Sequence, residues 1–260
     1  MRTLIADMDQ FARTALLYGS EAMERLKNSR VAVFGVGGVG GYVVEALVRS
    51  GVGALDIVDN DTVSLTNLNR QIIALHSTIG QSKTAVMQAR IADISPECRV
   101  VAHTLFFSEE TKEQFDFSQY DYVVDAIDSV KSKLLLAELC TAQGVPLIAS
   151  MGTGNKTDPT QFCITDISKT AYDPLARVMR YELRKRGIRH LTVLCSTEQP
   201  KKPAAEQVQA VQAQENSKGR TVPASNAFVP PAAGLIIASR VINDLTGTND
   251  GKRITTASAD

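Results

Sequence analysis

The stretch Val31-Ala-Val-Phe34 followed by Gly35-Val-Gly37-Gly38-Val-Gly40 decides the fold. The apolar run predicts a buried strand, and residues 39–49 predict the helix that follows it. A Gly-x-Gly-x-x-Gly motif between a strand and a helix is typical of nucleotide-binding turns. The first glycine permits the tight turn, the second lets the backbone approach a phosphate, and the third lets helix and strand pack closely. The N–H groups at the start of the helix then attract an anion.

An acidic residue completes this motif. A second apolar run, Leu55-Asp-Ile-Val58, ends in Asp59, about 20 residues beyond the glycine turn. A carboxylate at the end of this strand accepts hydrogen bonds from ribose hydroxyl groups. A glycine turn that served only for packing would not need the acid. Two chemistries remain open at this point: hydride transfer with a dinucleotide and activation of a carboxylate with ATP.

Strands and helices alternate along the rest of the chain. We expect strands at 98–103, 120–124 and 145–150, and helices at 82–94, 109–115 and 130–143. This alternation predicts the α/β class, with a Rossmann-like, doubly wound, mostly parallel sheet and a small C-terminal extension. We expect four parts: an N-terminal helical segment at 1–29, a nucleotide-binding core at 30–157, a C-terminal part at 158–246 that completes the same domain, and a polar tail at 247–260. Residues 198–225 are rich in Gln, Ala, Lys and Pro, which predicts a long mobile loop that covers a site.

The composition argues against several classes of protein. Lys plus Arg equals Asp plus Glu at 28 each in 260 residues, so the overall charge indicates no particular partner. The four cysteines form no Cys-x-x-Cys pair, which argues against a structural zinc site and favours a reducing compartment. The first ten residues carry acids and lack the apolar core of a signal peptide, and no apolar stretch is long enough to span a membrane. We therefore expect a cytoplasmic protein.

Four charged residues are candidates for the site, and two of them, Lys83 and Asp128, allow two interpretations. Lys83 lies in the first turn of a helix, where its positive charge is unfavourable beside the helix dipole. It is either an ordinary surface lysine or one that faces an anionic ligand. Asp125 and Asp128 follow a buried strand, at the edge where parallel sheets bind ligands. Asp128 is either the N-cap of the next helix or a ligand of Mg²⁺. Arg13, taken alone, is a solvated surface charge.

A basic helix is expected from Leu175 to Arg186. Such a run is either a solvated face or a contact with a phosphate backbone. Its basic side chains, with one just beyond it, are Arg177, Arg180, Arg184, Lys185, Arg186 and Arg189.

The polar tail behind Asp59 discriminates between the two chemistries. The pattern Asp59-x-Asp61-x-Val63-x-x-x-Asn67-x-Asn69-Arg70-Gln71, followed by Gly80-x-x-Lys83 and Asp125-x-x-Asp128, resembles the ubiquitin-activating-enzyme-like (MoeB/ThiF-type) adenylating superfamily. Three segments are similar to the bacterial tRNA threonylcarbamoyladenosine dehydratases within it: Arg13 to Gly19, Asn67 to Leu75, and Asp158 to Asp166 with Lys169-Thr170 and Asp173-Pro-Leu175. The resemblance covers residues 11–198 and 224–245.

The resemblance implies a role for each matching residue. Asp59 would hold the ribose of ATP, Asp128 would bind Mg²⁺, and Arg13 would reach the ATP of the neighbouring subunit in a homodimer. The implied catalytic residues are Arg13, Arg70, Lys83 and Asp128. The implied nucleotide contacts are Gly35, Gly37, Gly38, Gly40, Asp59, Asp61, Asn67, Asn69, Arg70 and Lys83. The family also allows a monovalent cation, held by backbone carbonyl groups.

The implied reaction is an ATP-dependent, cyclising dehydration of the threonylcarbamoyl group on a tRNA adenosine. The carboxylate would be adenylated with loss of pyrophosphate, the side chain would attack its own activated carbonyl, and AMP would leave. The main alternative is an adenylating activator of a ubiquitin-like sulfur-carrier protein, with a sulfur-transfer protein as partner. A nucleotide-sensing scaffold would not need the full set of Arg70, Lys83 and Asp128. An NAD-dependent dehydrogenase ranks last, because none of the three histidines lies in a catalytic context.

The chain departs from its relatives in its cysteines. Members that activate sulfur carriers often bind zinc through two Cys-x-x-Cys pairs, and this chain has neither. Some dehydratases place a cysteine near the start of the last helix, where this chain reads Pro223-Ala-Ser-Asn-Ala-Phe228. Cys195 is in a plausible loop position, but it also suits a buried strand end. A covalent thioester step is therefore not expected.

Overall fold

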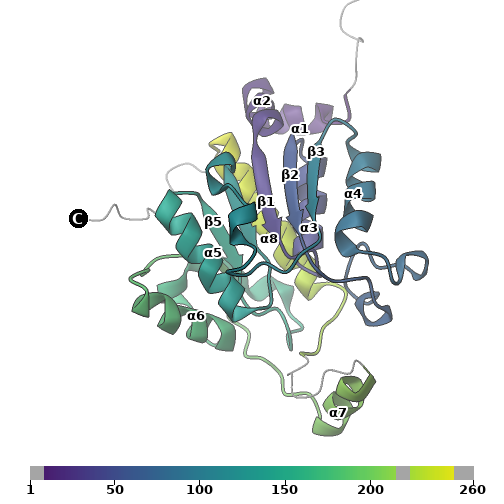
Figure 1. Cartoon of the computed structure of the whole chain (residues 1–260), viewed down its shortest axis with the longest axis vertical. Coiled ribbons are helices and arrows are strands. Elements are labelled where there is room, and N and C mark those ends of the chain that lie inside the picture. The colour runs from purple at the N-terminus through teal and green to yellow at the C-terminus, as the bar shows by residue number, and fades with distance from the viewer. Residues whose placement is uncertain (1–8, 215–222, 249–260) are drawn as a thin grey trace, which may run out of the picture.

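A seven-stranded sheet forms the centre of the protein (Figure 1). The computed structural model describes residues 9–214 and 223–248. The strands are β1 (Arg30–Phe34), β2 (Ala54–Val58), β3 (Arg99–His103), β4 (Tyr122–Asp125), β5 (Leu147–Ser150), β6 (Phe162–Asp166) and β7 (Thr192–Ser196). Their order is β3-β2-β1-β4-β5-β7-β6, and all neighbours are parallel except β6, which runs antiparallel to β7. The predicted α/β class and mostly parallel sheet are confirmed.

Helices cover both faces of this sheet. The helices of the described residues are α1 (Ala12–Tyr18), α2 (Ser20–Asn28), α3 (Gly40–Arg49), α4 (Lys83–Ile94), α5 (Val130–Gln143), α6 (Pro174–Lys185), α7 (Ala205–Gln214) and α8 (Val229–Thr246). Of these, α7 lies apart from the sheet (Figure 1). In Figure 1, α5 and α6 lie in front of the sheet, and α3 and α8 lie behind it. Within the described ranges, no helix is long and apolar enough to cross a membrane.

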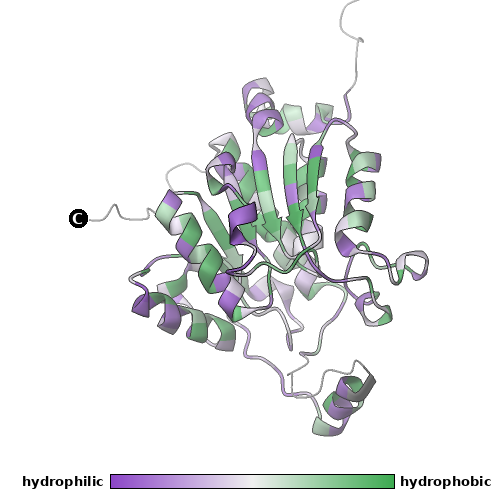
Figure 2. Cartoon of the chain, viewed as in Figure 1, coloured by the Kyte–Doolittle hydropathy of each residue, from purple (hydrophilic) through white to green (hydrophobic). Residues whose placement is uncertain are grey.

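The continuous apolar run of β1 follows from these two layers. Val31 and Val33 pack into the cluster that contains α3 and α8, whereas Ala32 and Phe34 face a second cluster that is rich in phenylalanine. Successive side chains of a strand point to opposite faces, so a strand that is covered on both sides must be apolar throughout. The hydropathy colouring shows this apolar centre and the polar outer helix faces (Figure 2).

Helix α8 belongs to the core of the domain. Its Gly234 face packs on the start of α3, where a Cβ at position 234 would lie 2.4 Å from the carbonyl oxygen of Val39. The last helix is thus part of the layer behind the sheet (Figure 1). The division of the chain into the four predicted parts stays a prediction.

The helix ends answer one question that the sequence left open. Ser129 caps α5, since its side chain accepts a hydrogen bond from the Ser132 N–H. The interpretation of Asp128 as this N-cap is therefore wrong, and its carboxylate is not used by the helix. Gly144 ends α5 in the left-handed region at φ 68°, as its place after the last apolar residue indicates.

Two predicted segments differ from the structure. The helix expected at 109–115 is replaced by two 3₁₀ turns, Lys112–Gln114 and Phe117–Gln119, because the buried rings of Phe115 and Phe117 must reach the core. The segment 198–225 contains α7 rather than an irregular loop throughout, because its Ala- and Gln-rich composition has good helix propensity. Residues 215–222 of that segment, residues 1–8, and the predicted polar tail beyond Thr248 lie outside the described residues.

A buried carboxylate links the sheet to the phenylalanine cluster. Asp56 on β2 is 2% exposed and accepts hydrogen bonds from Arg30 Nε at 2.8 Å and Tyr120 OH at 3.0 Å, and its Oδ2 lies 3.0 Å from His103 Nε2. Burial alone would raise the pKa of the Asp56 carboxyl, but the hydrogen bonds from His103, Arg30 and Tyr120 hold this pKa below its ordinary value. The folded state therefore favours the ionised form.

We expect Asp56→Asn to lower the free energy of unfolding at pH 7 by about 3 kcal/mol, because it leaves the Arg30 charge without its buried partner. The difference from the wild type should shrink as the pH falls below about 4, because the unfolded carboxyl takes up its proton before the folded one does. Urea unfolding between pH 7 and pH 3 measures both effects. The exposed Glu97→Gln variant is the control, and an Asp56→Asn difference that is independent of pH would contradict the assignment.

Candidate functional site

A cleft of about 1290 Å³ opens at the carboxyl ends of β1, β2 and β4. The arrowheads of these strands point toward the end of the molecule at which α7 lies (Figure 1). β1 and β4 are neighbours, but α3 and α5, which follow them, pack on opposite faces of the sheet. The chain therefore diverges at this point, which is where open α/β sheets bind their ligands.

The glycine turn forms the floor of the cleft. Gly35, Gly37 and Gly38 line it. Gly35 has φ 94°, and a Cβ at position 40 would lie 1.8 Å from the Gly35 carbonyl oxygen, so this turn excludes side chains at both positions. A Cβ at position 37 would meet nothing closer than Gln71 Nε2 at 3.8 Å. The space above Gly37 is therefore open for a ligand that approaches the backbone.

Asp59 stands beside this turn at the end of β2. Its Oδ2 accepts a hydrogen bond from the Val36 N–H at 2.7 Å, and its Oδ1 accepts one from the Asp61 N–H at 2.8 Å. Burial raises the pKa of the Asp59 carboxyl, and the charge of Lys83 opposes this rise. Each carboxylate oxygen keeps one further lone pair for a donor. The side chain is thus placed to accept hydrogen bonds from a ligand in the cleft.

Lys83 lies in the cleft wall and is not an ordinary surface lysine. It is 5% exposed, and its Nζ lies 2.7 Å from Asp61 Oδ2 and 3.8 Å from Asp59 Oδ1. A buried ammonium needs an anionic partner, which the two carboxylates supply. The interpretation of Lys83 as a residue that faces an anionic ligand fits this position, because all three side chains line the cleft.

In the polar loop that follows Asp61, some side chains line the cleft and others form hydrogen bonds with the backbone of the loop. Asn69 and Arg70 line the cleft, and Arg70 Nη1 donates to Asn69 Oδ1 at 2.8 Å and to the Thr66 carbonyl oxygen at 2.9 Å. Asn67 is 9% exposed, and its Oδ1 accepts a hydrogen bond from the Ser64 N–H. It is not among the residues that line the cleft. Asn67 therefore shapes the loop that presents Arg70.

The sequence interpretation missed two features of the cleft wall. Gln71 is 7% exposed, and its Oε1 is buried without a hydrogen-bond partner in the described part of the chain. It follows Arg70 in the quoted pattern, which was the available signal. Phe106, which is 50% exposed, lines the cleft together with Leu105 and Phe107. No local pattern marks these three, because the irregular segment that carries them becomes a wall only in the folded chain.

The two acids after β4 have different roles. Asp125 is fully buried beside Lys133 Nζ at 2.9 Å and also accepts a hydrogen bond from the Ile127 N–H. Burial raises the pKa of the Asp125 carboxyl, and Lys133 opposes this rise. Asp128 is exposed and lines the cleft, and its carboxylate forms no hydrogen bond or ion pair within the described residues. Asp125 thus holds the turn that presents Asp128.

Arg13 does not reach the cleft of its own chain. It is exposed on α1, which lies at the amino-terminal ends of the strands, opposite the side on which α7 lies (Figure 1). The structure therefore brings together Asp59, Asp61, Arg70, Lys83 and Asp128 with the glycine turn, and leaves Arg13 outside.

The cysteines do not contribute to the cleft. Cys195 is 3% exposed on β7, 3.8 Å from Cys163 Sγ on β6, and it does not line the cleft. Burial and the neighbouring Cys163 raise the pKa of the Cys195 thiol to about 12, which disfavours the reactive thiolate. The interpretation as a buried strand residue is confirmed. Within the described ranges, no group of three His, Cys, Asp or Glu side chains is placed to hold a metal ion.

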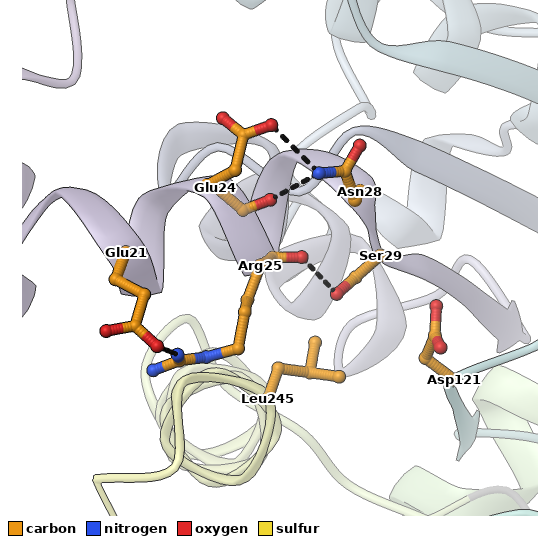
Figure 3. A pocket seen from close by; sticks show the side chains of 7 residues that line it. All are labelled: Glu21, Glu24, Arg25, Asn28, Ser29, Asp121 and Leu245. Atoms are coloured by element: carbon orange, nitrogen blue, oxygen red, sulfur yellow. Dashed lines mark hydrogen bonds and ion pairs between the residues drawn. The ribbon is translucent and has the colours of Figure 1, made fainter.

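A second, smaller hollow of about 490 Å³ lies between α2 and α8 (Figure 3). Its polar side chains bind one another or the adjacent backbone: Arg25 pairs with Glu21, Asn28 bonds to Glu24, and the Ser29 hydroxyl donates to the Arg25 carbonyl oxygen. It contains none of the residues that the sequence singled out. We therefore place the functional site in the larger cleft.

Residues 11–257 match the ThiF family. The chain belongs to this family. A tRNA threonylcarbamoyladenosine dehydratase of Bacillus subtilis (strain 168) is 49% identical over 251 residues, which are 95% of this chain and 98% of that protein. The crystal structure of the E. coli tRNA N6-threonylcarbamoyladenosine dehydratase TcdA in complex with ATP matches with a TM-score of 0.81 at 34% identity, and the match covers 92% of this chain and 94% of that one.

A relative of a second type matches this ThiF-family chain over a shorter length. The sulfur carrier protein adenylyltransferase of Thermus thermophilus is 34% identical over 150 residues, which are 57% of this chain and 55% of that protein. The resemblance inferred from the sequence is therefore confirmed, both for the adenylating superfamily and for the dehydratases within it.

We expect Gly40→Ala to lower the free energy of unfolding by about 3 kcal/mol or more, because the new Cβ would collide with a backbone carbonyl that cannot move aside. Gly37→Ala, for which the structure leaves room, should change this free energy by less than about 1 kcal/mol. Thermal unfolding of both variants without ligand makes the comparison. Equal stability of the two variants would show that the turn is not constrained as described.

Proposed function

We propose that this chain catalyses the ATP-dependent, cyclising dehydration of a threonylcarbamoyl group on a tRNA adenosine, in the cytoplasm. One observation carries the proposal: the cleft residues belong to a chain that matches the B. subtilis dehydratase along 95% of its length. The match to the structure of E. coli TcdA in complex with ATP supports the nucleotide.

In this proposal the cleft binds ATP through groups of known position. The glycine turn, with Gly35, Gly37, Gly38 and Gly40, approaches the phosphates with its backbone, as the open space above Gly37 supports. Asp59 accepts the ribose hydroxyl groups. Arg70, Lys83 and Asn69 contact the phosphates, while Asn67 and Asp61 act through the loop and through Lys83.

The chemistry explains why cations gather at this point. The carboxylate of the threonylcarbamoyl group attacks the α-phosphorus of ATP, and pyrophosphate leaves. An anion is repelled by the triphosphate, so Arg70 and Lys83 lower the barrier by neutralising this charge. A nucleophilic atom of the same side chain then attacks the acyl carbon, the ring closes and AMP leaves. This step gains from being intramolecular, so the protein needs no covalent nucleophile of its own.

Asp128 fits a magnesium site. Its exposed carboxylate faces the cleft without an internal partner, and Mg²⁺ at nucleotide sites is commonly held by one or two carboxylates, phosphates and water. A bound Mg²⁺ would supply further neutralisation of the phosphate charge. The monovalent cation of the family stays a prediction from the resemblance.

Arg13 completes the proposed site only from a second subunit. It lies on the side of its own protomer that is opposite the cleft. On the same short helix, Leu16 is 89% exposed and Leu17 is 76% exposed. Exposed leucines of this kind are typical of a surface that a partner covers. We therefore propose a homodimer in which Arg13 of one protomer enters the cleft of the other.

The alternative activity, activation of a sulfur-carrier protein with a sulfur-transfer partner, has weaker support. The sulfur-carrier adenylyltransferase shares 55% of its length with this chain, and the zinc-binding Cys-x-x-Cys pairs are missing. No observation of the cleft favours a protein C-terminus as substrate.

Incubation with ATP, Mg²⁺ and tRNA that carries threonylcarbamoyladenosine tests the proposal. We expect mass analysis of the nucleosides to show the loss of water, with formation of AMP and pyrophosphate. Asp128→Ala should reduce this rate at least about 100-fold without changing the unfolding temperature, because it removes a ligand of the charge-neutralising ion. The exposed Asp93→Ala variant is the control. No loss of water, although the protein binds ATP, would refute the proposed function.

The position of Arg13 predicts complementation between inactive variants. Arg13→Ala and Asp128→Ala are each expected to be inactive, but a mixed dimer contains one cleft with both residues intact. After subunit exchange in an equal mixture, about a quarter of the wild-type activity should return, because half of the dimers are mixed and each has one complete site. Two affinity tags establish that mixed dimers form. Mixed dimers without activity would contradict the shared site.

A further inference from the structure

The outer face of α6 is not covered by any described part of the chain. Tyr181, Arg184 and Lys185 lie four, seven and eight residues after Arg177, which places all of them on one side of the helix. Ala176, Met179 and Leu183 form the buried side. Tyr181 is 62% exposed. We define the outer face by Arg177, Tyr181, Arg184 and Lys185; of its three cations, Lys185 pairs with Glu182 at 2.9 Å, and the two arginines form no ion pair within the described residues.

The basic residues of this region fall into two groups. Arg180 donates to the carbonyl oxygen of Thr170, and Arg186 pairs with Glu182 and Glu138, so both are used within the fold. Arg177, Arg184 and Arg189 are exposed and form no ion pair within the described ranges. In a chain with no net charge, three unpaired guanidinium groups on one short segment are a local excess that attracts a polyanion.

Exposed aromatic rings accompany these charges. Lys185 Nζ stands 4.1 Å from the centroid of the Tyr181 ring, which holds the ring at the surface. Tyr172, just before the helix, is 61% exposed and has φ 61°. Exposed aromatic rings between arginines are typical of surfaces that follow a nucleic acid backbone and stack its unpaired bases. An acidic protein would need the charges but not the rings.

A buried ion pair fixes the start of α6 to the cleft. Asp173 caps the helix at the Ala176 N–H, and its Oδ2 lies 3.7 Å from Lys156 Nζ. Both side chains are at most 1% exposed. Lys156 Nζ in turn donates to the Gly152 carbonyl oxygen at 2.6 Å, and the next two residues line the cleft. The outer face of α6 therefore begins one short connection away from the site.

The rim of the cleft continues the basic surface. The Lys201 N–H donates to the carbonyl oxygen of Asn155, which directly follows the cleft residue Gly154. Lys201 and Lys202 are both exposed. Two exposed cationic residues thus lie next to the segment that lines the cleft.

We infer that the outer face of α6, together with Arg189, is the surface on which the RNA substrate lies while its modified nucleotide enters the cleft. The free arginines bind backbone phosphates, and Tyr181 stacks on an unpaired base. This inference rests on the proposed function, because it is the RNA substrate of that reaction that the surface holds.

The test is a charge-reversal variant, Arg177→Glu with Arg184→Glu, in the full-length protein. We expect its affinity for tRNA carrying threonylcarbamoyladenosine to fall about 10-fold or more at low salt, and the salt dependence of binding to weaken by about one counterion for each lost phosphate contact. The matched control is Lys27→Glu with Arg99→Glu, two exposed residues that flank Gly53 at the amino-terminal ends of the strands. It makes the same change in net charge and should bind as the wild type does.

Tyr181 provides a second measurement that charge does not affect. Tyr181→Ala should weaken binding about 5-fold or more through the loss of one stacked base, whereas Tyr181→Phe keeps the ring and should bind normally. ATP binding and the unfolding temperature should stay unchanged in all of these variants. Unchanged RNA affinity and salt dependence in the charge-reversal variant would overturn the inference.

Two further outcomes separate this inference from the proposed function. If the wild-type protein binds the tRNA through these residues but does not dehydrate it, the proposed reaction is refuted and the assignment of the RNA-binding surface is retained. Polyglutamate that binds as tightly as the tRNA, and loses affinity equally in the charge-reversal variant, would identify a surface for acidic protein and overturn the assignment to RNA.

Discussion

The carbonyl oxygen of Gly35 occupies the place that a side chain at position 40 would need, and the whole cleft depends on this close approach. The turn is also bonded to its neighbours: the Gly35 N–H donates to the Val58 carbonyl oxygen at 2.7 Å, and the Val36 N–H donates to Asp59 at 2.7 Å. The end of β2 is therefore fixed to the start of α3. The N–H groups at the start of α3 and the carboxylate of Asp59 meet at one point because Gly35 and Gly40 leave room for this approach.

Charge balance sets the next condition. An ammonium group as buried as that of Lys83 costs several kcal/mol unless an anion lies beside it. Asp61 and Asp59 supply that anion in the chain itself, and phosphate groups can take over the same role. The raised pKa of Asp59 shows that burial outweighs the attraction of Lys83 at this carboxyl. The ammonium group of Lys83 can thus pair either with these two carboxylates or with an anionic ligand in the cleft.

The sequence predicted what is encoded locally. β1, β2 and α5 have the expected bounds, because apolar runs and glycine or serine ends determine them. Asp59, Asp61, Arg70, Lys83 and Asp128 of the quoted pattern do meet in one cleft, whereas Asp125 is buried beneath it and Arg13 lies outside the cleft of its own chain. Contacts between residues that are distant in the sequence could not be predicted. Examples are the unpaired oxygen of Gln71, the position of Phe106 in the cleft wall and the Lys156–Asp173 ion pair, which all arise only on folding. The helix expected at 109–115 failed for the same reason, since the demand of the core for phenylalanine overrides helix propensity.

An intramolecular ring closure changes what the protein must provide. No cysteine is needed as a nucleophile, which agrees with the distance of Cys195 from the cleft and with its raised thiol pKa. The reaction that competes with ring closure is hydrolysis of the acyl adenylate by water. Apolar residues of the cleft therefore matter as much as its cations, because water excluded from the site cannot hydrolyse the intermediate. Pro203, Val208 and Val211 supply such a lining from the connection between β7 and α8. This connection thus carries apolar side chains into the cleft that also contains Arg70 and Lys83, which suits a reaction that needs both neutralised phosphate and protection from water.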